Sequence, residues 1–437
     1  MKNIIVALFC FLIGFVNVYS QHPDSLWKPI DELPSNPGAR FEDMIFFDKT
    51  SGLGIDLFGL VFWSKNGERG ITTVFNDAGV KQTGTRCIAF QSREHGWIGT
   101  LDSLNPLMET IDSGKTWHNV TLPEPKPSGI CGMWALNDKI LFGCGAFDIG
   151  FVTHPYGRAV FVKTTDGGKS FTTKDMSSYA LTLVDCYFTT PENGLVTGSV
   201  DGKDYKNGHA VILATDDGGL SWKTVYKSTR IGEQGWKIYF RTATEGYVAL
   251  QSPMTSGDKY IAKTTDGGKT WKEVFLGNAS MKGFPQGVCF VDEQNGIVGG
   301  YGDTVFATSN GGVSWTKYGS RVIYSMNRSR KLDDTTAYII ASQVHSFRKS
   351  PVTGVSEIER KSPFVPYPNP STEAVTIALP FDGLCWVKIF NSRGKAIDAV
   401  IADNYVRIPT HLLPNGMYVV VIESRYGIKT EKFMVER

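Results

Sequence analysis

The segment Thr264–Trp271, TTDGGKTW, occurs in five similar versions along this chain. Each version follows one pattern: Thr, any residue, Asp or Asn, any residue, Gly, any residue, Ser or Thr, and an aromatic residue. The other four are TIDSGKTW, TTDGGKSF, TDDGGLSW and TSNGGVSW, which begin at Thr110, Thr164, Thr215 and Thr308. Successive copies begin 44 to 54 residues apart, which indicates a structural repeat. Repeats with a period of this size are typical of propellers and solenoids.

The chemistry of the repeated segment predicts a tight turn between two strands. Its acid or amide accepts hydrogen bonds from backbone N–H groups further along, and its glycine reaches positive φ at low cost. The closing aromatic residue enters a strand and packs between neighbouring sheets. We therefore assign structural roles to Asp112, Gly114, Trp117, Asp166, Gly168, Phe171, Asp217, Gly219, Trp222, Asp266, Gly268, Trp271, Asn310, Gly312 and Trp315. Catalysis by these acids is the alternative, but a carboxylate bound to its own backbone is a poor proton shuttle.

A second pattern lies between these turns. An aromatic residue ends one strand, and the next strand begins six residues later, usually at glycine, as in Phe90 with Gly96, Phe188 with Gly194 and Phe290 with Gly296. Each unit therefore contains four short antiparallel strands, which is the composition of a β-propeller blade. The predicted fold class is all-β.

Residue spacing also predicts the number of blades. In four units, the last aromatic of the turn precedes the next strand-ending aromatic by 17 to 19 residues. The same spacing from Trp315 places a degenerate seventh blade at about 322–350, and the same spacing backwards from Phe46 reaches Trp27. We expect a seven-bladed ring in which the N-terminal segment supplies the outer strand of the last blade and removes its free edge. Six blades, with 322–350 as a linker, are the alternative.

The repeated turn resembles the Asp-box, or BNR repeat, of sialidases, sortilin-type receptors, xyloglucanases and the photosystem II assembly propeller family. The resemblance covers roughly residues 25–350. Within the five copies, the sequence departs from the Asp-box pattern at Asn310, which replaces Asp. It implies a propeller that either binds a partner without catalysis or hydrolyses glycosides.

The N-terminus has the pattern of a secretory signal peptide, residues 1–20. Lys2 is followed by an apolar stretch, 4–16, and by small side chains before Gln21. That stretch is too short to span a bilayer. Cys10 lies inside it, after the bulky Phe9, which argues against a lipoprotein. We expect an exported chain without a transmembrane segment, and residues 21–350 as its propeller.

Composition changes near KSPFVPYPNP, residues 361–370, where four prolines indicate a linker over 351–370. Residues 371–437 return to short strands and predict a small β-sandwich. Tyr367–Pro370, Arg393–Lys395, Leu413–Tyr418 and the basic-ended strand 429–437 resemble the type A sorting domain of the type IX secretion system of Bacteroidota. The resemblance implies Sec-dependent export, type IX machinery as the partner of 371–437, and a secreted or outer-membrane surface location. An ordinary ligand-binding sandwich is the alternative.

Charge and cysteine content exclude several classes of function. Forty-five basic and 43 acidic side chains give a net charge of +2, which argues against a nucleic-acid binder. The chain has no CxxC pair and no cluster of histidines, so we expect no metal site, and no motif suggests a cofactor. We expect the cysteines after the signal peptide to be buried apolar thiols. A cross-strand disulfide is an open alternative for Cys131 and Cys144, which lie on strands joined by a short turn.

The second connections of blades three, four and five are long: 145–158, 199–209 and 252–259. Insertions on adjacent blades are where propellers build binding surfaces. Their aromatic and charged side chains suit a carbohydrate or a protein surface. The candidate contacts are Phe147, Asp148, Phe151, His154, Tyr156, Arg158, Asp201, Asp204, Tyr205, Lys206, His209 and Asp258. Solvated loops without a ligand are the alternative.

Three functions follow from this sequence. The preferred one is a non-catalytic, secreted or surface-attached propeller that binds an extracellular protein or glycan. The second is a glycoside hydrolase of the sialidase or another type, although the Arg-Ile-Pro signature occurs only at Arg407–Pro409, outside the propeller, and no catalytic carboxylate pair can be nominated. The third is a surface protein that decorates the cell or adheres to a host.

Overall fold

The computed structural model describes residues 27–30, 40–48, 51–65, 68–73, 84–145, 159–202, 207–252, 257–278, 283–302, 304–319, 323, 325–333, 336–348, 366–379, 385–402, 405–424 and 427–437. The secondary-structure elements in this part of the chain are strands. They divide into two compact units, one before and one after residue 351. No helix of the described residues is long and apolar enough to cross a membrane.

The described residues of the first unit form seven four-stranded antiparallel sheets, numbered here in chain order. Sheet 1 contains β2 (Phe41–Phe46), β3 (Ser51–Asp56), β4 (Leu60–Lys65) and β5 (Glu68–Thr73). Sheet 2 contains β6 (Thr85–Phe90), β7 (Gly96–Thr100), β8 (Leu107–Thr110) and β9 (His118–Asn119). Sheet 3 contains β10 (Gly132–Ala135), β11 (Leu141–Gly145), β12 (Val160–Thr164) and β13 (Thr172–Asp175).

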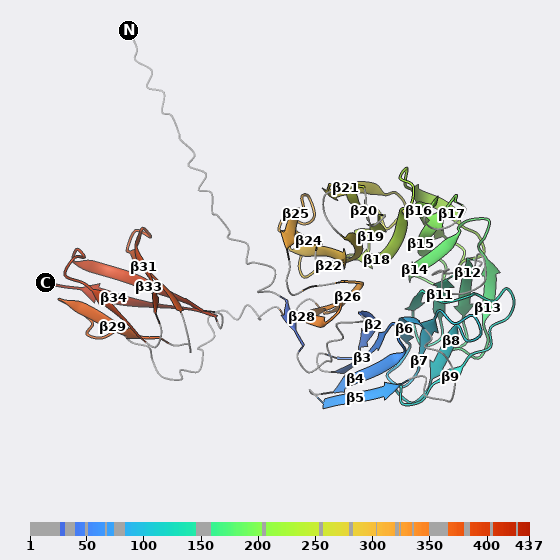
Figure 1. The fold of residues 1–437 in the computed structure, drawn as a ribbon, viewed down its shortest axis with the longest axis horizontal. Coiled ribbons are helices and arrows are strands. Elements are labelled where there is room, and N and C mark those ends of the chain that lie inside the picture. The colour runs from blue at the N-terminus through green and yellow to red at the C-terminus, as the bar shows by residue number, and fades with distance from the viewer. Residues whose placement is uncertain are drawn as a thin grey trace, which may run out of the picture. The chain divides into compact units, whose positions relative to one another are not determined.

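The next three sheets repeat this plan. Sheet 4 contains β14 (Thr182–Phe188), β15 (Gly194–Val200), β16 (His209–Thr215) and β17 (Lys223–Lys227). Sheet 5 contains β18 (Gln234–Phe240), β19 (Gly246–Gln251), β20 (Lys259–Thr264) and β21 (Lys272–Gly277). Sheet 6 contains β22 (Phe284–Phe290), β23 (Gly296–Tyr301), β24 (Thr304–Thr308) and β25 (Thr316–Gly319). The sheets follow one another around a ring, with the first strand of each sheet nearest the centre (Figure 1). The predicted all-β propeller is confirmed.

Sheet 7 joins the two ends of the ring. Its strands β26 (Arg328–Asp333), β27 (Thr336–Ile340) and β28 (Val344–Arg348) are completed by β1 (Lys28–Pro29), which pairs antiparallel with β28. Trp27 is buried before β1, and its ring lies 5.7 Å from that of Phe347. The first described strand therefore lies beside the last strand of the ring.

The recurring pair of an aromatic residue and a glycine has a steric cause. Phe188 pairs across the strands with Gly194, and the Phe188 ring covers the glycine so closely that a Cβ there would lie 2.2 Å from a ring carbon. Phe240 covers Gly246 in the same way, at 2.6 Å. Glycine is needed at these positions because any side chain would displace the ring from the core between sheets.

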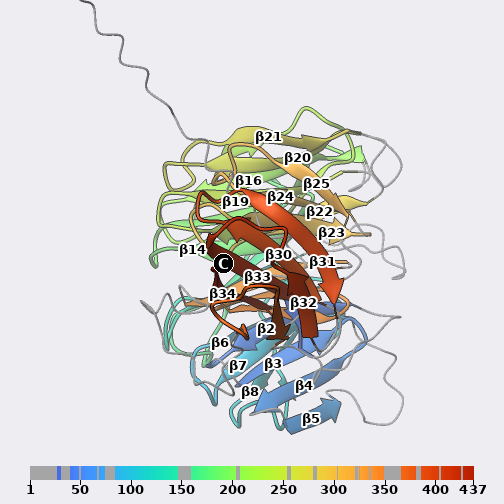
Figure 2. The same cartoon turned by 90° about the vertical axis from the view of Figure 1, so that its left-hand side faces the viewer.

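The second unit is a small two-sheet sandwich. One sheet pairs β29 (Ala374–Ala378) with β32 (Tyr405–Pro409), and the other has the order β31 (Ala396–Ala402), β30 (Cys385–Asn391), β33 (Gly416–Ser424) and β34 (Gly427–Val435). Figure 2 shows these strands in orange to dark red. Buried and exposed side chains alternate along β32. Its inward side chain Ile408 packs in one core with Val420 and Phe433 of the larger sheet.

Candidate functional site

The two faces of the ring differ in their connections. The first and third connections of each sheet, which include the Asp-box turns, lie on one face, here called the turn face. The second connections and the links between sheets lie on the other face, here called the loop face. The described residues that flank the predicted long insertions therefore belong to the loop face, while 146–158, 203–206 and 253–256 lie outside the described residues.

Bulges in the innermost strands supply polar side chains to the centre of the ring. The register shifts between Phe41 and Asp43, and comparable shifts occur in β6, β18 and β22. A bulge places residues outside the strand ladder and turns their side chains away from the regular alternation. The residues at these bulges are Glu42, Arg86, Trp236, Lys237 and Gln286. All five are buried, and they lie in the half of each strand nearest the loop face.

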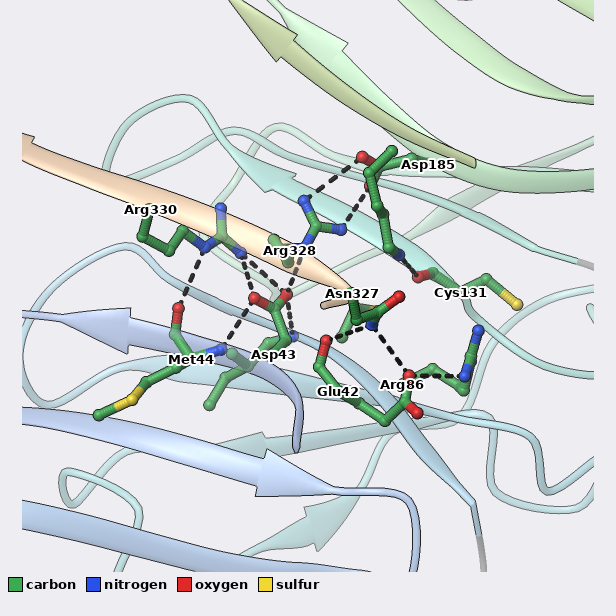
Figure 3. A network of polar contacts seen from close by, with 12 residues as sticks. Glu42, Asp43, Met44, Arg86, Cys131, Asp185, Asn327, Arg328 and Arg330 are labelled. Atoms are coloured by element: carbon green, nitrogen blue, oxygen red, sulfur yellow. Dashed lines mark hydrogen bonds and ion pairs between the residues drawn. The ribbon is translucent and has the colours of Figure 1, made fainter. Parts of the chain in front are cut away.

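A charged cluster, here called the central network, joins five of the seven sheets (Figure 3). Its members are Glu42, Asp43, Arg86, Asp185, Lys237, Asn327, Arg328 and Arg330. Arg328 bridges two carboxylates: its Nη2 lies 2.7 Å from Asp185 Oδ1, and its Nε lies 3.3 Å from Asp43 Oδ2. Arg330 Nη2 donates to both Asp43 oxygens, at 2.7 and 2.8 Å. One buried arginine thereby connects sheets 1, 4 and 7.

Glu42 is the carboxylate of the central network that binds Arg86, Arg40 and Asn327. Its carboxylate accepts from Arg86 Nη1 at 2.6 Å and from Arg40 Nε at 2.9 Å. Asn327 Nδ2 donates to the same carboxylate at 3.0 Å, while the Asn327 Oδ1 accepts from Trp236 Nε1 at 2.8 Å. The Arg86 guanidinium lies over the Trp236 ring, 5.6 Å from its centroid.

Two carboxylates of the central network, Glu42 and Asp43, are held in the ionised form. Burial alone would raise the pKa of Glu42, but the guanidinium groups of Arg40 and Arg86 outweigh it and lower that pKa below its usual value. Burial likewise opposes the charge of Asp43, and Arg328 with Arg330 lowers its pKa. Burial lowers the pKa of Lys237, and the charge of Arg328 adds to that effect. An ionised carboxylate clamped by arginine is unsuited to act as a general acid.

Nine of the twelve loop contacts predicted from the sequence lie outside the described residues: Phe147, Asp148, Phe151, His154, Tyr156, Arg158, Asp204, Tyr205 and Lys206. Asp201 forms an ion pair with Lys227 at the edge of sheet 4. His209 stands opposite Val200, and Asp258 is exposed beside the buried Lys259. No contact among the described residues joins Asp201, His209 and Asp258, so a shared site for them remains a prediction.

An acid–base cluster between sheets 4 and 5, here called the Arg230 cluster, was not predicted from the sequence. Arg230 Nε lies 2.8 Å from Glu233 Oε1, and Arg230 Nη1 lies 2.8 Å from Glu273 Oε2. Tyr226 donates its hydroxyl to Glu273 at 2.7 Å. Burial raises the pKa of Glu233, whereas the hydrogen bond from Arg230 lowers that of Glu273. The spacing of Arg230 and Glu233 is visible in the sequence, but Glu273 and Tyr226 join them only in the fold.

The loop face also exposes large apolar side chains on four connections. Phe58, Leu104, Ile231 and Tyr301 are exposed by 44, 77, 66 and 46 %. Phe58 and Leu104 follow the second strands of sheets 1 and 2, and Tyr301 ends the second strand of sheet 6. Ile231 lies in the link between sheets 4 and 5. Apolar and aromatic side chains of this kind supply contact area in protein interfaces.

The Asp-box turns satisfy their acids locally. Asp166 accepts from the Ser170 hydroxyl and backbone N–H and from Thr164 Oγ1, and these hydrogen bonds lower its pKa to about 2. The pKa of Asp266 is about 2 for the same reason. In the fifth copy the Asn310 amide oxygen accepts from the Ser314 N–H at 3.0 Å. Because an amide serves equally well there, the position requires an acceptor, not a proton donor.

The disulfide considered for Cys131 and Cys144 is absent, since both thiols are free in the structure. Cys144 stands opposite Gly132, not opposite Cys131. The Arg86 guanidinium faces the Cys131 thiol at the ring centre, whereas Cys144 packs with Cys186 and Phe142 between sheets 3 and 4. A one-residue difference in register sends two side chains to opposite faces of a strand. No group of three or more potential metal ligands occurs among the described residues.

Comparison with known families matches both parts of the chain. Residues 179–353 match the model described as Photosynthesis system II assembly factor YCF48, and residues 366–436 match the Secretion system C-terminal sorting domain. The predicted Asp-box propeller and type IX sorting domain are therefore confirmed. The sorting domain marks a protein that is exported and is secreted or held at the cell surface.

Solved structures resemble the chain in fold. A structure of YCF48 bound to D1 peptide is 14% identical, with a TM-score of 0.54, over 74% of this chain and 96% of that one. The GH74 enzyme of Niastella koreensis is 13% identical, with a TM-score of 0.51, over 93% and 67%. The GH74 xyloglucanase of Xanthomonas campestris is 11% identical, with a TM-score of 0.52, over 93% and 74%. No curated protein matches the chain by sequence.

Proposed function

We propose that this exported protein is a non-catalytic propeller whose loop face binds an extracellular protein or glycan. The observation that carries the proposal is the contrast on that face between a charge-paired centre and exposed apolar side chains around it. The ion pairs of the central network fix the inner strands, and a rigid ring presents its connections without reorganisation on binding.

The chemistry of the ring centre supports binding without catalysis. Its carboxylates Glu42, Asp43 and Asp185 each contact at least one arginine at 2.7 Å or less. Glycoside hydrolysis needs one protonated and one free carboxyl group around an open space. Glu42 and Asp43 are paired with arginine and have lowered pKa values, so neither supplies the protonated group.

The similar solved structures are consistent with this proposal. One YCF48 structure holds a bound D1 peptide, so a propeller of this fold binds a polypeptide. By analogy, we expect a polypeptide or glycan of the cell exterior as the partner of this chain.

Matched substitutions on the two faces test the proposal. We expect the double variant Leu104→Ser with Ile231→Ser to lower partner binding about tenfold or more, because it removes apolar contact area from the loop face. The control is Ile111→Ser with Val313→Ser, which alters equally exposed apolar side chains on the turn face. The measurement is retention of the full mature chain on a glycan array, together with crosslinking to surface proteins of the exporting cells. Equal losses in both variants would contradict a loop-face site.

Glycoside hydrolysis is the second candidate, favoured by the Arg230 cluster. Two carboxyl groups share one arginine there, and their pKa values are shifted in opposite directions. Such divergence is a mark of acid and base partners. A panel of fluorogenic glycosides tests it: our proposal expects no turnover by the mature chain. Turnover that Glu233→Gln abolishes and that the exposed-turn control Glu192→Gln retains would establish the hydrolase instead.

A further inference from the structure

A cavity of about 370 Å³ opens between sheets 4 and 5 on the turn face, on the side of the ring opposite to the loop face. Its walls come from β15, β16 and β17 and from the Asp-box turn of sheet 5, which are neighbours in the ring (Figure 1). The side chains of Tyr187 and Phe240, stacked with ring centroids 4.5 Å apart, form one wall. The volume lies in the range of about 300–1,000 Å³ that is usual for small-molecule sites.

Other sheets show what normally fills this space. Each second strand pairs a residue with the one just before the Asp-box threonine: Trp97 with Glu109 in sheet 2, Phe142 with Lys163 in sheet 3, and Tyr247 with Lys263 in sheet 5. These pairs combine an aromatic ring with a long charged side chain. In sheet 4 the corresponding pair is Leu195 with Ala214. Both side chains are smaller than their counterparts in sheets 2, 3 and 5, and the cavity lies beside them. Sheet 6 has a similar pair, Ile297 with Ala307, but the sheet that follows it has no Asp-box.

The two lysines make a specific contact in their crevices. Lys163 Nζ donates to the Gly218 carbonyl at 3.2 Å, and Lys263 Nζ donates to the Gly311 carbonyl at 3.5 Å. Each accepting glycine occupies the same position in the Asp-box of the following sheet. The corresponding glycine after sheet 4 is Gly267, which lines the cavity. Within the described part of the chain, no side chain donates to its carbonyl.

We propose that this cavity binds a saccharide ring. A sugar hydroxyl takes the place of the missing lysine as donor to the Gly267 carbonyl, and the C–H face of the sugar packs on Leu195 and Phe240. The charges at the cavity argue against a cationic ligand, because Lys223 pairs with Asp216 at 3.1 Å and Lys269 is the remaining charge of the lining. The Lys269 ammonium group offers donors to sugar oxygens or to the carboxylate of an acidic sugar.

A filling substitution tests the proposal with a matched control. Ala214→Lys restores the side chain found in sheets 3 and 5. Ala307→Lys places the same residue at the same position in sheet 6, which is followed by a sheet without an Asp-box. The probes are arrays of neutral and uronic-acid oligosaccharides, followed by calorimetry with the full mature chain. We expect binding by the parent chain, a loss of at least about tenfold in Ala214→Lys, and no change in Ala307→Lys.

Each outcome decides the proposal. Binding of neutral sugars, acidic sugars or both, with loss confined to Ala214→Lys, supports it and identifies the sugar class. Absence of saccharide binding by the parent chain, or equal responses of the two lysine variants, overturns it. If Ala214→Lys does not fold, as seen from its thermal melting, Leu195→Trp fills the same space with the residue that sheet 2 carries there. Saccharides whose binding is lost in Ala214→Lys and retained in the double variant Leu104→Ser with Ile231→Ser are assigned to the cavity. Ligands with the reverse pattern are assigned to the loop face, so failure here is distinct from failure of the loop-face proposal.

Discussion

The turn face and the ring centre are built by opposite principles. On the turn face, five nearly identical segments each satisfy their own polar groups, and Asp166, for example, finds its partners within four residues. At the centre, the five sheets of the central network contribute different residues, and partners are far apart in the chain: Arg330 and Asp43 are separated by 287 positions. Repetition stabilises each blade by itself, whereas the unrepeated contacts hold different blades to one another.

The largest expected effect on the free energy of unfolding comes from a substitution in the central network. Arg328→Met removes the cation between Asp43 and Asp185 and leaves two buried carboxylates short of a counter-charge, which costs about 3–5 kcal/mol of unfolding free energy. Urea unfolding of the mature chain measures it. The matched control is Arg93→Met, whose pair with Asp48 is about half exposed and is worth roughly 0–1 kcal/mol. Similar costs for the two variants would contradict the distinction between centre and periphery.

The second prediction concerns the dependence of stability on pH. Glu42 and Asp43 have folded-state pKa values below their ordinary 4.5 and 3.8, so their ion pairs stabilise the fold above these values. That stabilisation is lost as the pH falls through the folded-state pKa values. We expect the difference in Tm between the parent chain and Asp43→Asn to be largest near neutral pH and to shrink steadily in acid.

Asp166→Asn is the turn-face counterpart in the same pH series. Its effect on Tm is smaller at every pH, because the Asp166 side chain is only partly buried and its hydrogen bonds compete with water. A Tm difference for Asp43→Asn that stays constant from neutral pH to acid would show that the charge of Asp43 contributes nothing to stability.

The smallest expected effect tests the turn itself. Asp112→Asn keeps the acceptor oxygen that binds the Thr116 N–H, as Asn310 does naturally, and changes stability little. Asp112→Ala removes that acceptor and costs about 1 kcal/mol. Chemical denaturation of both variants distinguishes them. If the asparagine variant loses as much as the alanine variant, the negative charge is essential and the acceptor argument is wrong.

Local chemistry was predictable from the sequence, and distant pairing was not. The Asp-box turns, the glycines beneath aromatic rings and the sorting domain depend on residues within a few positions of one another. The central network depends on bulges in β2, β6 and β18. The positions of bulges cannot be predicted from the periodicity of the sequence. The cysteines show how sensitive such pairing is, because one residue of register separates Cys131 from the strand position opposite Cys144.

The cavity between sheets 4 and 5 shows a further limit of pattern reading. Repeats are recognised in a sequence by the features that they share. Leu195 and Ala214 matter because they depart from the aromatic and charged residues of sheets 2, 3 and 5, and that departure gains meaning only once the strand pairing is known.

Site-specific photo-crosslinking tests the central claim about function most directly. A photoreactive residue replaces either Leu104 on the loop face or Ile111 on the turn face of the exported chain, and the crosslinked products are identified by mass spectrometry. We predict a discrete partner adduct from position 104 and none from position 111. An adduct formed only from position 111, or formed equally from both, would contradict recognition through the loop face.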